Sequence, residues 1–438
     1  MKKAIKLVAA VLAMLLLSGC VRTVDQMYRV PKRSDAYNNL QSAIDNAITG
    51  LEYCAPRAGE NQQNVQMADL DGDGVQEYLL FAKSNQKRPL KILLFRNVDG
   101  IFTNTDTVEF NGTSFDQVEY VDMDGDGGLE IVVGRLLSDQ VIRSVSVYTF
   151  TNDVLVQLAT VNYTRFLTTD LDNDQLSELL VFRPGQTDTD NGIAELYSMK
   201  DGEMERYNEV SMSQPADKLK RIIIGKLDGG KTAVYTACIV GDTALVTDVF
   251  MLKDAMLTNV AFSNETGTAV QTLRNYYVYA DDIDNDSVVE LPYLITMKPI
   301  DGMVSAQTHQ LIRWYAMTPE GGEVDKMYTY HNFVGGWYIQ LQRQWAPRLV
   351  VKNAGPQYEF YIWDEDYKNV QKIMTLFVIT TQNREEQAKT GGYVILHRTD
   401  STVYAAAMES CASEYGLTAE NITYSFRIIQ NDWKTGET

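Results

Sequence analysis

Asp69-Leu70-Asp71-Gly72-Asp73-Gly74-Val75-Gln76-Glu77 is the most informative segment of this chain. It is an acidic loop that leads directly into the apolar run Tyr78-Leu79-Leu80-Phe81, which is typical of a β-strand. In so short a loop, the carboxylates at its first, third, fifth and ninth positions converge on one point. The carbonyl of the seventh position can add a fifth oxygen. Hard oxygen ligands in this number suit Ca²⁺.

The same pattern returns three times further along the chain, each time ahead of a β-rich run. We therefore expect up to four Ca²⁺ sites, each with four acids and the carbonyl of the seventh position as ligands. The predicted ligands are Asp69, Asp71, Asp73, Val75 and Glu77; Asp122, Asp124, Asp126, Gly128 and Glu130; Asp170, Asp172, Asp174, Leu176 and Glu178; and Asp282, Asp284, Asp286, Val288 and Glu290.

The sixth position of each loop predicts how strong each site is. Glycine adopts a left-handed backbone at little cost, and Gly74 and Gly127 occupy that position in the first two loops. Gln175 and Ser287 occupy it in the others, so the first two sites should be the strongest. The alternative is that all four segments are ordinary solvated turns.

The loops recur about every 50 residues, a spacing typical of propeller blades. A further loop is therefore expected near residue 226, where the chain reads Lys226-Leu227-Asp228-Gly229-Gly230-Lys231. Only Asp228 remains there of the liganding acids. We interpret this unit as a degenerate blade without a metal.

The acidic loops resemble the calcium loops of FG-GAP and VCBS-type propeller repeats, such as those of integrin α-subunits. Those families usually have Asp at the ninth position, where this chain has Glu. The resemblance implies a mostly β fold containing a calcium-binding β-propeller. About four strand-like runs per unit, and five units, favour five blades. The alternative is a sixth blade, to which the N-terminal segment would supply strands.

The remaining chain divides around this propeller. We expect a signal peptide and lipobox at 1–20, a tether and a helix within 21–64, the propeller at 65–327 and an α+β domain at 328–438. The N-terminal helix should cover 36–51, because Leu40, Ile44, Ile48 and Leu51 share one face. Within the last domain, the sequence favours a short helix at 366–372.

The first twenty residues predict where the protein resides. Two lysines precede a short apolar run, which ends in Leu17-Ser18-Gly19-Cys20. This resembles a bacterial lipobox and implies acylation of Cys20, with the body held at the extracytoplasmic face of the cell membrane. The alternatives are a cleaved signal peptide with an incidental cysteine, or an uncleaved anchor.

Composition and motifs limit the function. The 438 residues carry a net charge of −19, which disfavours a nucleic-acid partner. The three histidines, His309, His331 and His397, form no recognisable catalytic frame, so an enzyme is the less favoured class. We expect a scaffold that binds an envelope protein or glycan. The alternative is an extracellular polysaccharide hydrolase or lyase with its site in the propeller cleft.

Overall fold

The computed structural model describes residues 35–138, 142–187, 189–300 and 311–429. Cys20, the signal sequence and His309 lie outside these ranges. Over these residues the chain is mostly β, with six antiparallel sheets and few helices. None of the helices in the described part is long and apolar enough to cross a membrane.

The first four sheets are consecutive antiparallel units in which each strand pairs with the next along the chain, as in a propeller blade. Their strands are β2 (Val65–Ala68), β3 (Glu77–Lys83), β4 (Leu90–Val98) and β5 (Ile101–Phe110); β6 (Ser114–Val121), β7 (Glu130–Leu136), β8 (Arg143–Thr151) and β9 (Val154–Tyr163); β10 (Arg165–Thr169), β11 (Glu178–Arg183), β12 (Ile193–Lys200) and β13 (Glu203–Ser211); and β14 (Leu219–Lys226), β15 (Thr232–Val240), β16 (Ala244–Lys253) and β17 (Met256–Asn259).

The fifth sheet begins the same way and then departs from the pattern. Its first strand is reduced to one bridge, between Asp281 and Glu290. It continues through β18 (Glu290–Ile295), β19 (Leu311–Met317) and β20 (Glu323–Asn332), and then β21 (Trp337–Leu341) and β27 (Phe426–Ile428) widen it. Five blade-like sheets are thus compatible with the five blades expected.

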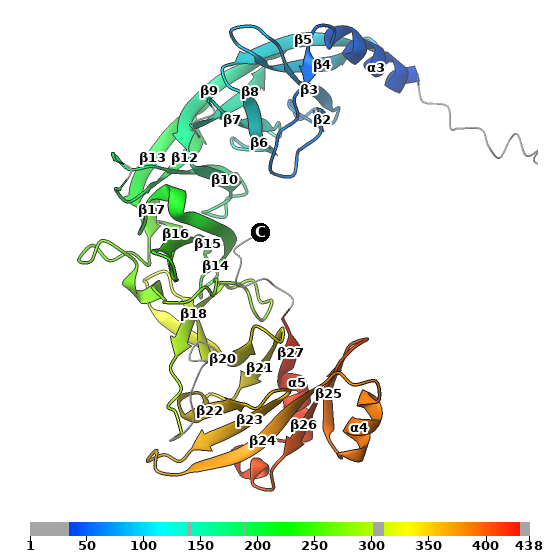
Figure 1. Cartoon of the computed structure of the whole chain (residues 1–438). Coiled ribbons are helices and arrows are strands. Elements are labelled where there is room, and N and C mark those ends of the chain that lie inside the picture. Colours follow the sequence, from blue (N-terminus) through cyan, green and yellow to red (C-terminus); the bar gives the residue numbers. More distant parts are fainter. Residues whose placement is uncertain (1–34, 139–141, 188, 301–310, 430–438) are drawn as a thin grey trace, which may run out of the picture.

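Consecutive sheets bury their apolar faces against each other, so the core is a series of layers. Phe81 of the first sheet meets Phe115 of the second, with ring centroids 5.1 Å apart. Val147 of the second sheet shares a buried cluster with Val181 of the third. In Figure 1 the sheets follow one another along an open arc, with the innermost strands β6, β10 and β14 toward its concave side.

The helix α3 (Asp35–Ala47) lies at one end of this arc. Leu40 and Ile44 are buried against Leu80 and Phe95 of the first sheet, which confirms the face expected from their spacing. The short strand β1 (Glu52–Tyr53) pairs with β3. The N-terminal segment therefore adds to the first sheet and not to a sixth blade.

The C-terminal part forms the sixth sheet, in the order β22 (Leu349–Asn353), β23 (Gln357–Trp363), β24 (Val370–Ile379), β26 (Val403–Met408), β25 (Val394–Arg398). Its helices are α4 (Arg384–Thr390) and α5 (Ala419–Ser425). No helix forms at 366–372, because β24 already begins at Val370. The expectation of a helix there was wrong.

The expected boundary between residues 327 and 328 falls inside β20. The chain does not divide at that point, because Tyr330 of β20 and Trp337 of β21 share one buried cluster with Phe360 of the sixth sheet. The strand β27 also returns from the C-terminal part to pair with β21. The fifth and sixth sheets therefore share a core.

Candidate metal centres

Each acidic loop connects the first strand of a sheet to its second strand. The turn needs left-handed backbone at its fourth and sixth positions: φ is 69° at Gly72 and 83° at Gly74. In the third and last loops Gln175 and Ser287 adopt φ of 77° and 71° at the sixth position. The backbone demand inferred from the glycines is therefore common to the loops, and non-glycine residues meet it at some cost.

Three acids of each loop gather at one point. In each loop, the carboxylates at the first, third and ninth positions each have one oxygen that lies within 4.8 Å of the corresponding oxygens of the other two. The four groups are Asp69, Asp71 and Glu77; Asp122, Asp124 and Glu130; Asp170, Asp172 and Glu178; and Asp282, Asp284 and Glu290. Twelve of the sixteen predicted carboxylates therefore cluster, and the acids at the fifth position are not in these groups.

The acids at the fifth position also shape the turn. Asp73, Asp126, Asp174 and Asp286 each accept the backbone N–H of the residue two positions later. These bonds are 2.7–2.8 Å long. The seventh position, which holds Val75, Gly128, Leu176 and Val288, thus supplies the amide that closes the turn.

The glutamate at the ninth position has one oxygen committed to the protein. Oε2 of Glu130 accepts the N–H of Met123 at 2.9 Å, and the same bond forms in the other three loops. In the last loop the second oxygen, Oε1 of Glu290, is buried and has no hydrogen-bond partner in the described structure. A buried acceptor left in this way normally needs a cation or a donor.

Burial and mutual repulsion raise the pKa of these carboxyls. Burial, with a smaller contribution from the neighbouring aspartates, raises the pKa of Glu130 and Glu178 to about 7 and that of Glu290 to about 8. The pKa values of Asp124, Asp172 and Asp284 also rise, by burial and by the aspartates beside them. The acids of these three loops form no ion pair with a basic side chain among the described residues, although Lys326 lowers the pKa of Asp284 from a greater distance. Their donors fit a hard divalent cation.

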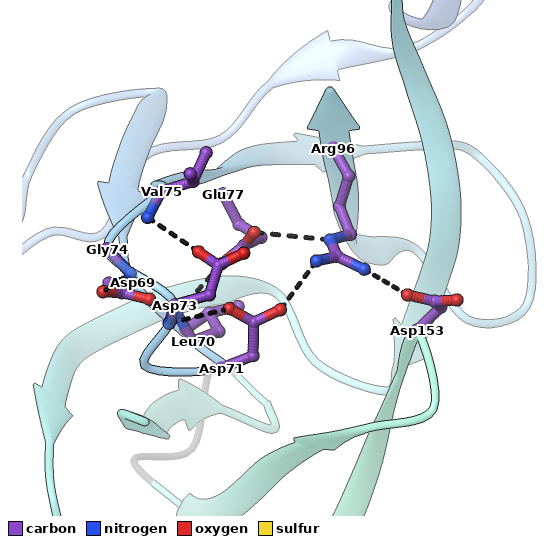
Figure 2. Close-up of polar contacts among 9 residues, drawn as sticks. All are labelled: Asp69, Leu70, Asp71, Asp73, Gly74, Val75, Glu77, Arg96 and Asp153. Atoms are coloured by element: carbon purple, nitrogen blue, oxygen red, sulfur yellow. Dashed lines mark hydrogen bonds and ion pairs between the residues drawn. The ribbon is translucent and has the colours of Figure 1, made fainter. Parts of the chain in front are cut away.

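The first loop differs because a basic side chain enters it. Figure 2 shows Arg96 of β4 reaching Asp71 and Glu77, with Nη2 2.6 Å from Asp71 Oδ2 and Nε 3.3 Å from Glu77 Oε1. Its other terminal nitrogen pairs with Asp153 of the hairpin between β8 and β9. Sequence reasoning missed Arg96, because it lies outside the loop and approaches it only through the pairing of β3 with β4.

The loops are packed in a row. The Ser177 N–H donates to the Asp122 carbonyl at 2.9 Å, which joins the second loop to the third. Lys226 N–H donates to the Ser287 carbonyl at 2.8 Å, which joins the degenerate fourth loop to the last. In the fourth loop Asp228 pairs with Lys326 at 2.8 Å. The remaining acid thus has a basic partner within the protein.

A polar cavity of about 620 Å³ lies at the end of this row. One wall is Asp282, Ile283, Asp284 and Asn285 of the last loop. The other walls come from β20, β21, β25, α5 and β27, and include Tyr338, His397, Tyr424 and Arg427. Tyr424 is 71% exposed.

Comparison with known proteins supports the repeat but not an activity. The model of the FG-GAP-like repeat matches residues 69–133, which include the first two acidic loops. No match was found among curated proteins. Among solved structures, the exotype rhamnogalacturonan lyase YesX is 15% identical, with 74% of this chain and 65% of that chain covered and a TM-score of 0.29.

Two other solved structures are similar at the same level. Rhamnogalacturonan lyase YesW is 14% identical over 74% of this chain and 72% of that one, with a TM-score of 0.31. The β-propeller domain of the Trilobed protease from Pyrococcus furiosus is 11% identical over 74% and 89%, with a TM-score of 0.29. The chain spans less than two thirds of the length of YesX, and superpositions this loose carry no argument about what it does.

Proposed function

We propose that this protein is a lipid-anchored, extracytoplasmic binding scaffold of the bacterial cell envelope, whose blade-like sheets are stabilised by Ca²⁺. The observation that carries the proposal is the buried Oε1 of Glu290, which has no hydrogen-bond partner in the described structure and belongs to the Asp282 and Asp284 cluster. Bound Ca²⁺ would neutralise the clustered carboxylates and join the start of a strand to the loop before it.

The residues that would hold the ion in the last loop are Asp282, Asp284, Asp286, Glu290 and the carbonyl of Val288. Oε2 of Glu290 accepts the Ile283 N–H, whereas Oε1 has no hydrogen-bond partner in the described structure, so Oε1 is the oxygen that we expect to face the metal. Ca²⁺ takes six to eight oxygen ligands. Five protein oxygens leave room for water or for the hydroxyls of a bound molecule.

The cavity beside this loop is where we propose that a partner binds. Its walls combine hydrogen-bonding side chains with the exposed ring of Tyr424 and the guanidinium of Arg427, which lies 4.9 Å from that ring. Its volume of about 620 Å³ suits a small polar segment. These features favour a glycan chain over a protein surface as the occupant.

Binding to envelope glycans in Ca²⁺ and in EDTA tests this function. We expect a polysaccharide ligand whose affinity falls at least tenfold in EDTA and in Tyr424→Ala. EDTA removes the ion from the loop that forms one wall, and Tyr424→Ala removes the aromatic ring from another. Tyr207→Ala is the matched control, since Tyr207 is 44% exposed on β13, away from the cavity. Binding that is unaffected by both EDTA and Tyr424→Ala would contradict the proposal, as would a protein ligand that binds elsewhere.

A further inference from the structure

Arg96 makes the first acidic loop chemically unlike the others. The guanidinium contacts two of the three clustered acids of its own loop, Asp71 and Glu77. Its charge lies beside the oxygens of Asp71 and Glu77 that a bound cation would contact, while Oδ1 of the third acid, Asp69, is buried without a hydrogen-bond partner in the described structure. Figure 2 shows the side chain directed from β4 toward the loop.

Strand register identifies the residues at the same place in the other sheets. In each sheet, the residue that follows the ninth-position glutamate pairs with an aromatic residue on the next strand; in the first sheet Tyr78 pairs with Phe95. The position that corresponds to Arg96 is the one directly after this aromatic residue. The four equivalent residues are Arg96, Thr149, Ser198 and Ala316. Arg96 is the one basic residue among these four.

The individual oxygens of the glutamates show what Arg96 replaces. In the first loop, as in the others, Oε2 accepts a backbone N–H, here that of Leu70 at 2.9 Å. The remaining oxygen, Oε1 of Glu77, accepts from Arg96. In the last loop the corresponding Oε1 of Glu290 is buried without a hydrogen-bond partner. In the second loop the neutral hydroxyl of Thr149 lowers the pKa of Glu130.

Lys326 does not form an ion pair with the acids of the last loop in the way that Arg96 does with those of the first. It lies on β20 near that loop, but its Nζ pairs with Asp228 of the degenerate fourth loop at 2.8 Å. The acids Asp282, Asp284 and Glu290 have no ion pair with a basic side chain among those found in the described residues. The last loop therefore has no counterpart of the guanidinium in the first.

We infer that Arg96 is the resident cation of the first loop, so that this loop is closed without Ca²⁺ while the second, third and last loops take the metal. The inference rests on the calcium role proposed above. A Ca²⁺ ion entering the first loop would have to displace the guanidinium from Asp71 and Glu77. It would also compete with the ion pair between Arg96 and Asp153, which joins the first sheet to the second.

Calcium bound per full-length chain, measured by equilibrium dialysis, tests the inference through two opposite substitutions. We expect three ions in the wild type and four in Arg96→Met, which keeps an apolar stem against Phe150. Thr149→Arg should place a guanidinium in the second loop and reduce the number to two. Arg206→Met is the control: Arg206 pairs with Glu195, outside any acidic loop, and its loss should leave three.

The outcomes separate this inference from the function it rests on. Four ions in the wild type, with no gain in Arg96→Met, would overturn the role of Arg96 and leave the calcium role intact. No bound calcium in any variant would overturn both. If Arg96→Met does not fold, Thr149→Arg still decides the question, because an unchanged count of three in that variant contradicts the inference.

Discussion

The glutamate at the ninth position of each loop serves two purposes that an aspartate would have difficulty combining. Its longer side chain lets Oε2 accept the backbone N–H of the second loop residue while the carboxylate still belongs to the acid cluster, as in Glu290. The sequence pattern identified this position as a ligand but left open how many oxygens it offers. The structure adds that Oε2 accepts the Ile283 N–H, which leaves Oε1 as the oxygen without a hydrogen-bond partner in the last loop.

Buried His331 provides a prediction about pH. The ring is 0% exposed and stacks between Phe333 and Tyr338, with centroids 5.2 and 4.9 Å away. Burial lowers its pKa to about 3. Because the folded pKa is below the unfolded value of about 6.5, the neutral ring contributes stability above pH 6.5, and this stability is lost as the pH falls toward 3.

The difference between wild type and His331→Phe isolates this effect. Below pH 6.5 the wild type should lose about 1.4 kcal/mol of unfolding free energy per pH unit relative to His331→Phe. Urea unfolding at pH 4.5–7.5 measures it. Phe333→Leu, which loosens the same stack but keeps the imidazole, should retain the wild-type slope. Parallel pH profiles for wild type and His331→Phe would show that the pKa of His331 is not lowered in the folded protein.

Individual residues could be predicted from the sequence where the information is local. The acids of the loops and the left-handed positions are fixed by spacing within nine residues. Arg96 was not predicted, because its proximity to Asp71 arises from strand pairing and not from a local motif. The role of Thr149 has the same origin.

At the scale of elements, the first two loops approach each other so closely that the contact depends on glycines, and a β-carbon on Gly72 would lie 2.8 Å from the backbone carbonyl carbon of Gly127. A β-carbon on Gly128 would lie 2.6 Å from the carbonyl oxygen of Leu70 in the first loop. The backbone of Gly128 lies outside the left-handed region, so glycine is required there because a side chain would have no space. The other loops have Val75, Leu176 and Val288 at this position.

Gly128→Ala should therefore force the first two loops apart and lower the unfolding free energy by about 1–3 kcal/mol, the usual cost of overpacking. Val75→Ala is the matched control, because Val75 holds the same place in the first loop and is 54% exposed. Urea unfolding of the two variants gives the comparison. Equal stability would mean that the loops can shift apart freely.

The elements themselves were predictable to different degrees. The strands after each acidic loop and the helix α3 follow from hydrophobic spacing, and both form. The C-terminal part was harder. The segment 366–372 is polar and charged, which suited a helix, but Val370–Ile379 pairs with two neighbours in the sixth sheet. That tertiary pairing outweighs the local preference.

The whole molecule should depend on calcium for its stability. Each filled site contributes RT ln(1 + [L]/Kd), about 2.7 kcal/mol at a hundredfold excess of ion. Calorimetric unfolding in Ca²⁺ and in EDTA should show a large upward shift in Tm with the ion. Asp124→Asn should remove part of that shift and change little in EDTA.

Asp201→Asn supplies the control for that measurement. It removes the same charge from an exposed hairpin turn between β12 and β13, where φ of 52° suits asparagine equally well. Its calcium shift should equal that of the wild type. Identical melting curves in Ca²⁺ and EDTA for the wild type would mean that the acidic loops are solvated turns.

The repeat and the mostly β class were predictable from the sequence, whereas the division of the molecule was not. Acidic loops end near residue 290, and composition changes soon after, which suggested a boundary at 327/328. The structure continues β20 through that point and returns β27 from the C-terminal part. A strand pairing between segments 90 residues apart leaves no local signal in the sequence.

The ion pairs of Arg96 also bear on the order in which the protein is assembled. A polypeptide is synthesised from its N-terminus, and its early units form first. The first sheet, with a guanidinium already in its loop, can complete itself in a compartment where calcium is scarce. It then offers an apolar face, including Phe81, on which the second sheet can stack. The second, third and fifth sheets, whose acidic loops would take calcium, would then become fully stable only where calcium is present.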